Sequence, residues 1–149
     1  MSEQSTPTLW LDLRRALPEA YRALAGLSRA GALEPILREL VKVRASQING
    51  CAHCTGEHME LALQAGEARA RLDALPAWHE SDLFTPAERA ALALTDAMTR
   101  LPVDGAPPEE VVREAAEHHP GEGLAHLIVT ITAINAWNRV ALTTAMGRG

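Results

Sequence analysis

The two cysteines of the chain, Cys51 and Cys54, form a C-x-x-C pattern at the start of a predicted helix. Residues three positions apart lie on the same face of a helix. The first helical turn also offers unpaired N–H groups and the positive end of the helix dipole. These features stabilise a thiolate, which is the reactive form of cysteine. The pattern therefore predicts thiol redox chemistry.

Acid/base groups surround the cysteine pair. Advancing by about 100° per residue places Cys51, Cys54 and His58 within an arc of roughly 60°, whereas His53 points to a different side. A neutral imidazole one turn beyond Cys54 can accept its proton, directly or through water. Glu39 lies on the preceding predicted helix and would orient His58 if the two helices pack side by side. For His53 two interpretations are about equal: a role on the substrate side of the site or at a subunit interface, and no functional role.

These residues fit a longer pattern, E-x11-C-x-H-C-x3-H, with R-x-S-Q-I-N-G leading into the first cysteine. The pattern closely resembles the AhpD-like alkylhydroperoxidase branch of the carboxymuconolactone decarboxylase family. All five positions match, namely Glu39, Cys51, His53, Cys54 and His58. The stretch 134–139, I-N-A-W-N-R, is also similar to the C-terminal helix of peroxidase-related members. The resemblance therefore extends from about residue 33 to residue 146.

The resemblance implies an all-helical, usually oligomeric protein whose cysteine pair reduces peroxides. No cofactor would be bound, and an external dithiol donor, a lipoyl or thioredoxin-like protein, would restore the thiols. Cys54, in phase with His58, is assigned as the attacking thiolate and Cys51 as the resolving thiol, although the two roles could be reversed. Decarboxylase members of the family lack the cysteine pair, which argues against decarboxylation here.

Other interpretations of the same residues stay open. The disulfide could act as a redox sensor or partner-binding switch without turnover. Cys51, His53, Cys54 and His58 could hold zinc, but the different direction of His53 disfavours this set of ligands. A decarboxylase or isomerase could use His58 without the thiols. Free cysteines are also often simply buried small hydrophobic residues.

Composition limits the class of protein. The 149 residues, 47% hydrophobic and only 3% aromatic, suit one domain with a core of Ala, Leu, Val and Ile, which favours packed helices. A net charge of −5 and a pI near 5.7, without a basic stripe, argue against nucleic-acid binding. The first residues do not resemble a secretory signal, so we expect a cytoplasmic protein. In a reducing compartment a C-x-x-C is more often catalytic or metal-binding than a permanent structural disulfide.

The hydrophobic spacing predicts an all-α fold of about six to seven helices over residues 9–149, after a flexible tail at residues 1–8. Asn49-Gly50 would separate the helix carrying Glu39 from the cysteine helix, and Gly66 would cap the latter. Thr85, Pro86 and Glu88 predict a capped helix start. The predicted helices span about 11–27, 33–48, 51–66, 68–75, 85–101, 107–119 and 122–146.

The last predicted helix, about 122–146, is apolar around much of its circumference. Polar residues interrupt it at helical intervals, among them His126, Thr130 and Asn138, so a soluble core or subunit interface fits better than a membrane span. One small domain cannot readily cover so many apolar faces, which predicts a homo-oligomer, whether dimer, trimer or hexamer.

Overall fold

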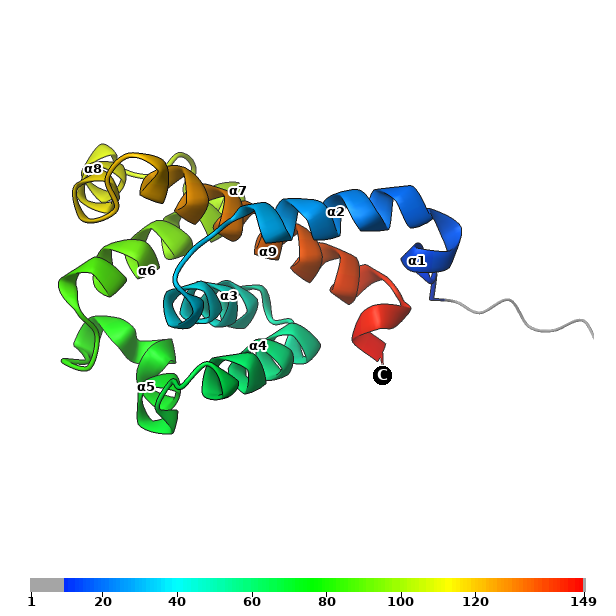
Figure 1. Ribbon diagram of the computed structural model, residues 1–149, viewed down its shortest axis with the longest axis horizontal. Coiled ribbons are helices and arrows are strands. Elements are labelled where there is room, and N and C mark those ends of the chain that lie inside the picture. Colours follow the sequence, from blue (N-terminus) through cyan, green and yellow to red (C-terminus); the bar gives the residue numbers. More distant parts are fainter. Residues whose placement is uncertain (1–9, 149) are drawn as a thin grey trace, which may run out of the picture.

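The computed structural model describes residues 10–148, so the tail predicted at residues 1–8 lies outside the described residues. The described chain is all-helical, as the sequence predicted, and Figure 1 shows its arrangement. The elements are α1 (Leu13–Ala16), α2 (Pro18–Ala30), α3 (Pro35–Asn49), α4 (Ala52–Gln64), α5 (Arg69–Ala74), the 3-10 helix η1 (Leu75–Glu80), α6 (Pro86–Thr99), α7 (Leu101–Asp104), α8 (Glu109–His118), α9 (Glu122–Thr143) and the 3-10 helix η2 (Ala145–Arg148).

Seven α-helices within residues 10–148 have six or more residues, in agreement with the expected six to seven. The two remaining ones, α1 and α7, are single turns of four residues that periodicity is too coarse to detect. The helix predicted to stop before Pro76 is followed directly by η1, because proline is tolerated in the first turn of a helix.

The predicted helix boundaries are mostly confirmed. Gly50 ends α3 with a φ of 70°, a left-handed conformation that glycine adopts without steric cost. Thr85 forms the expected capping box with Glu88 at the start of α6. The predicted cap at Gly66 is wrong by one residue: Ala65 is the C-cap of α4, and Gly66 turns the chain just after it.

Helix α3 lies at the centre of the molecule and is buried continuously from Glu39 to Ser46. On one side Leu40 and Val43 pack into an apolar cluster with residues of α4, α5, η1 and α6. On another side Val41 joins a second cluster with α6, α8 and α9. Burying a leucine or valine side chain contributes about 1.5–3 kcal/mol. This apolar burial fixes α3, and with it the polar residues that share the helix.

Two polar networks, one buried and one partly buried, add long-range restraints on α3. Asp96 of α6 accepts hydrogen bonds from Arg44 Nε at 2.7 Å and Nη2 at 2.9 Å, and from Trp78 Nε1 at 3.2 Å. At the C-terminal end of α3, Asn49 Nδ2 donates to the side-chain oxygens of Asn135 and Asn138 on α9, both at 2.9 Å. Because a buried polar group must find a partner, these networks fix the position of α3 relative to α6 and α9.

Helix α2 packs along α9, as Figure 1 shows, and its C-terminal end is fixed tightly. A Cβ atom on Gly31 would lie 2.3 Å from Thr130 Oγ1 and 3.2 Å from the Thr130 backbone nitrogen, so only glycine allows this approach. The next backbone N–H, that of Ala32, donates to His126 Nδ1 at 3.1 Å. This junction fixes the end of α2 beside α3 and α9.

None of the helices in residues 10–148 is both long and apolar enough to cross a membrane. Helix α9 instead buries a stripe of residues in the core, listed here: Leu127, Thr130, Ile131, Ala133, Ile134, Asn138 and Ala141. Ile128 and Leu142 of the same helix are exposed. The predicted homo-oligomer stays a prediction.

Candidate functional site

Cys51 and Cys54 form a disulfide at the start of α4, with Cα atoms 5.3 Å apart. This separation falls within the range of about 4.4–6.8 Å that a disulfide requires. Cys51 is the N-cap of the helix, and its Sγ accepts a hydrogen bond from the Cys54 backbone N–H at 3.2 Å. The first turn of α4 therefore directs a backbone donor at sulfur, as the sequence analysis expected of a helix start.

His58, one turn beyond Cys54 on α4, contacts Glu39 of α3. His58 Nδ1 lies 2.8 Å from Glu39 Oε2, while Arg38 Nε donates to Glu39 Oε1 at 2.9 Å. The Glu39 side chain is only 3% exposed. Burial by itself raises the pKa of Glu39, but the hydrogen bonds from His58 and Arg38 outweigh this effect and the pKa lies below its ordinary value. Glu39 is therefore a carboxylate at neutral pH.

The ionised state of Glu39 determines how His58 is protonated. A carboxylate only accepts hydrogen bonds, so His58 Nδ1 must carry the proton in the contact with Glu39. Nε2 of the neutral ring is then the free acceptor nitrogen. The condition set in the sequence analysis, that the two helices pack side by side, is met by α3 and α4.

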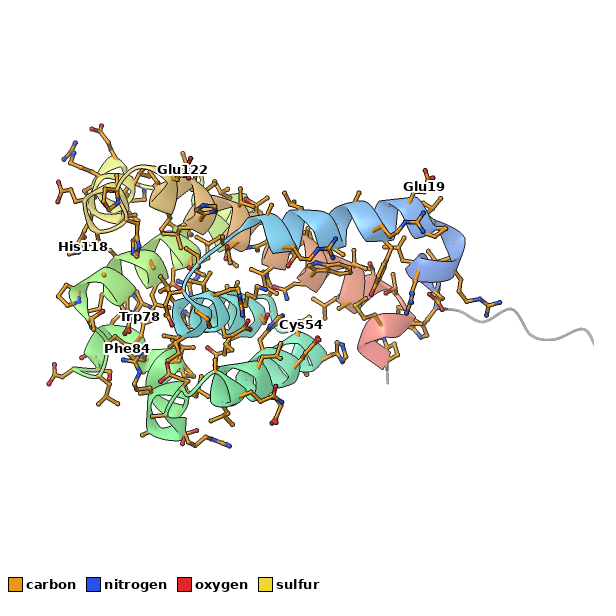
Figure 2. The ribbon with its side chains drawn as sticks, in the orientation of Figure 1. Glu19, Cys54, Trp78, Phe84, His118 and Glu122 are labelled. Atoms are coloured by element: carbon orange, nitrogen blue, oxygen red, sulfur yellow. A yellow bond between two sulfur atoms is a disulfide. The ribbon has the colours of Figure 1, made fainter. Side chains whose placement is uncertain are left out.

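Cys54 and His58 line the same cavity, whose volume is about 400 Å³. Figure 2 shows Cys54 near the middle of the molecule, at the end of α4 that approaches α9. Cys51 is 1% exposed and does not line the cavity. Helices α2, α4 and α9 and the final turn η2 contribute the lining residues, which are Tyr21, Ala25, Ser28, Arg29, His53, Cys54, Glu57, His58, Ile134, Trp137 and Met146.

His53 also lines this cavity, although it lies on a different side of the helix from Cys54 and His58, as the sequence analysis expected. His53, Cys54 and His58 all lie within α4, so His53 does belong to the neighbouring face of the helix, about 100° from Cys54. The His53 side chain is 43% exposed and lies 3.8 Å from Glu57 Oε2. His53 therefore stands at the rim, where a long side chain reaches the cavity from the next face.

The wall contributed by α2 was missed in the sequence analysis. Tyr21, Ala25, Ser28 and Arg29 follow the i, i+4, i+7, i+8 spacing of one helix face, and this spacing is the signal that could have identified them as a group. Trp137 of α9 completes the wall, with its ring centroid 5.2 Å from that of Tyr21 in an edge-to-face contact. Trp137 belongs to the stretch 134–139 noted in the sequence analysis, and it lines the cavity.

The four residues weighed as zinc ligands are not arranged as a metal site. Both sulfur atoms belong to the disulfide, and His58 Nδ1 contacts Glu39. Within residues 10–148, no group of three or more His, Cys, Asp or Glu side chains is placed to hold a metal ion.

Comparison with known proteins places this site in a family. Residues 15–97, more than half of the chain, match the carboxymuconolactone decarboxylase family, and this segment includes Glu39, both cysteines and His58. The chain belongs to this family. It is an AhpD-like member, as the pattern around the cysteines indicated.

Two relatives of this AhpD-like chain are similar over nearly their whole length. YdfG of Bacillus subtilis, an uncharacterised protein, is 38% identical over 133 residues, which cover 87% of this chain and 88% of YdfG. The crystal structure of ATU0492 from Agrobacterium tumefaciens has a TM-score of 0.83 and 33% identity, covering 91% of this chain and 94% of that one. ATU0492 is described as a protein of unknown function, provisionally assigned as the antioxidant defence protein AhpD.

Proposed function

We propose that this protein is a thiol-dependent alkylhydroperoxidase that acts in the cytoplasm. The observation that supports the proposal most directly is that Cys54 and His58 line one cavity, while a buried carboxylate, Glu39, holds the far nitrogen of His58. A thiol, a base and a group that orients the base are the parts of an activated nucleophile. The position of Cys54 at the cavity, with Cys51 behind it, favours Cys54 as the attacking residue.

In the reduced protein, His58 Nε2 takes the proton of the Cys54 thiol and the Cys54 thiolate forms. Glu39 stabilises the resulting imidazolium through the bond to Nδ1. The thiolate sulfur then attacks the terminal oxygen of the hydroperoxide, and the O–O bond breaks. The departing alkoxide takes the proton from His58 and leaves as an alcohol, and Cys54 becomes a sulfenic acid.

The Cys51 thiol then attacks the sulfur of the Cys54 sulfenic acid, which displaces hydroxide. The hydroxide combines with the proton lost by Cys51 to form water, and the disulfide results. No bound cofactor is needed for these steps. An external dithiol, from a lipoyl or thioredoxin-like protein, restores both thiols. Its first thiolate attacks Cys54, the sulfur at the cavity, and after Cys51 has left, its second thiol displaces Cys54 and the donor becomes a disulfide. Cys51 leaves as a thiolate that the N–H of residue 54 stabilises.

The test is steady-state consumption of tert-butyl hydroperoxide with an NADH-coupled lipoyl system and an NADPH-coupled thioredoxin system. We expect turnover by the wild type and none by Cys54→Ser or Cys51→Ser. His118→Ala is a matched histidine control, because His118 is exposed and Figure 2 shows it at the end of the molecule away from Cys54. No turnover with either reducing system and no single-turnover oxidation of the dithiol form would reject the proposal.

The same assays separate this function from the alternatives. A redox switch would form the disulfide with peroxide but would not turn over with a dithiol donor. The family to which the chain belongs also contains decarboxylases, whose chemistry on this fold would rely on His58 and survive replacement of both cysteines by serine. Activity of the serine double variant on a lactone substrate would favour that alternative.

A further inference from the structure

A second cavity lies beside the first, on the other side of Glu39. We call it the basic recess; its volume is about 430 Å³ and its lining residues are Ser28, Arg29, Gly31, Arg38, Glu39 and Lys42. Three of these side chains are cations and one is a carboxylate, so the recess has an excess of positive charge. The carboxylate, Glu39, is already engaged by His58 and Arg38.

Lys42 is the notable member of the basic recess, because its side chain is mostly buried while its ammonium opens to the recess without a direct partner among the described residues. It is only 8% exposed, and within residues 10–148 no group forms a hydrogen bond or an ion pair with its ammonium. Burial lowers the pKa of Lys42, and the charge of Glu39 opposes this effect. Burying a charged group is costly unless an opposite charge accompanies it. A ligand anion in the recess would supply that charge.

The basic recess and the cavity at Cys54 are neighbours. Ser28 and Arg29 of α2 line both of them, and the Glu39–His58 pair stands between the two, with Glu39 lining one and His58 the other. A single small molecule lying under α2 can therefore present one group to Cys54 and another to Lys42. The walls beside Cys54 include the rings of Tyr21 and Trp137, which suit an apolar or aromatic body.

We propose that the basic recess binds the carboxylate of an organic hydroperoxide whose peroxide group reaches Cys54, with Lys42 and Arg29 as the cationic partners. A monoanion fits better than a phosphate dianion, because Glu39 places a negative charge at the wall of the recess. The inference rests on the proposed peroxidase function and specifies its substrate class: hydroperoxides that combine an apolar body with a carboxylate.

The test compares two hydroperoxides with the same reactive centre, cumene hydroperoxide and its para-carboxylate. We expect the wild type to prefer the carboxylate, measured as the ratio of the two kcat/KM values. Lys42→Met should lower this ratio by about 10–100-fold, the usual effect of losing a charged hydrogen bond. Arg29→Gln, a change at an exposed position, should lower the ratio in the same direction. Arg113→Met on α8 is the matched control and should keep the wild-type ratio, since Arg113 is exposed and pairs with Glu109 of its own helix.

Binding to the disulfide form gives a readout that needs no turnover. Calorimetry should show that 4-(2-hydroxypropan-2-yl)benzoate binds and that 2-phenylpropan-2-ol binds at least 10-fold more weakly, with the difference lost in Lys42→Met and in Arg29→Gln. Lys42 is also the only lysine of the sequence, so its signal after reductive ¹³C-methylation should shift with the benzoate alone.

The two proposals fail in different ways. Selective binding of the benzoate without consumption of either hydroperoxide would uphold the basic recess and reject the peroxidase. Equal kcat/KM values for both hydroperoxides, unchanged in Lys42→Met and Arg29→Gln, would uphold the peroxidase and overturn the recess as a carboxylate site.

Discussion

The coupling between Glu39 and His58 can be tested with a double-mutant cycle. Replacing Glu39 by glutamine keeps a side-chain oxygen that can accept from His58 Nδ1 but removes the negative charge. A hydrogen bond to a charged group contributes about 1.5–3 kcal/mol and a neutral one about 0.5–1.5 kcal/mol. The difference of about 1–2 kcal/mol corresponds to a roughly 5–30-fold slower reaction of Cys54 with peroxide, since about 1.4 kcal/mol is tenfold.

Removal of the base itself should slow the reaction of Cys54 with peroxide more than Glu39→Gln does. His58→Ala should slow the reaction about 10²–10⁴-fold near neutral pH, the usual range for a positioned general base. If Glu39 acts only through His58, the double variant should react no more slowly than His58→Ala alone. Raising the pH above about 8.5, the pKa of an ordinary thiol, should partly rescue all three variants, because the thiolate then forms unaided.

The assay is stopped-flow oxidation of the prereduced protein by tert-butyl hydroperoxide between pH 6 and 9.5, followed by tryptophan fluorescence, because Trp137 lines the cavity. Circular dichroism of each variant would establish that it is folded. Equal rates for the wild type and His58→Ala across the neutral range would refute the relay and leave the helix start as the main source of thiolate stabilisation. Multiplicative effects of the two substitutions would show that Glu39 acts independently of His58.

Further predictions concern stability and assembly. Asp96→Ala should lower the free energy of unfolding in urea by about 3–5 kcal/mol, because it leaves the buried Arg44 charge unpaired; a loss below 1 kcal/mol would contradict this. The pKa of Glu39 is lower in the folded protein than its ordinary value of 4.5, so its charge stabilises the fold above that pH and the stabilisation is lost as the pH falls through the lowered pKa. Glu39→Gln should therefore be less sensitive to acid in urea titrations than the wild type. Gly31→Ala should lower the free energy of unfolding by about 1–3 kcal/mol in the same experiment, because its Cβ would clash with Thr130. A variant as stable as the wild type would show that α2 can move away. Light scattering should find a homo-oligomer at micromolar concentration, with a stable monomer as the contrary result.

The sequence predicted the parts of the fold and site that local geometry determines. Helical spacing places Cys54 and His58 on one face of α4, and the Asn-Gly pair ends α3 just before Cys51. The contact between Glu39 and His58 was a conditional expectation, because it depends on how two helices pack. Packing is set by apolar clusters spread over the whole chain, which one segment of sequence does not reveal.

Features that depend on distant partners could not be predicted in this way. Arg44 and Asp96 are 52 residues apart, and each alone resembles an ordinary solvated helix charge. The same holds for Lys42, whose burial follows from the central position of α3 rather than from its neighbours in sequence. Tyr21 and the rest of the α2 wall reach the site through the packing of α2 along α9, where Gly31 closely approaches Thr130.

The placement of Cys51 beside Cys54 also bears on how the protein would survive an excess of oxidant. With the two Cα atoms 5.3 Å apart, the disulfide closes within one helical turn, so no segment has to unfold or swing before Cys51 attacks. A sulfenic acid at Cys54 would then be consumed by its neighbour before a second peroxide could convert it to the irreversible sulfinic acid. In the proposed peroxidase, proximity of this kind would protect the protein from inactivation by its own substrate. Where the resolving thiol must first move into place, the sulfenic acid persists for longer, and inactivation then depends more strongly on the peroxide concentration.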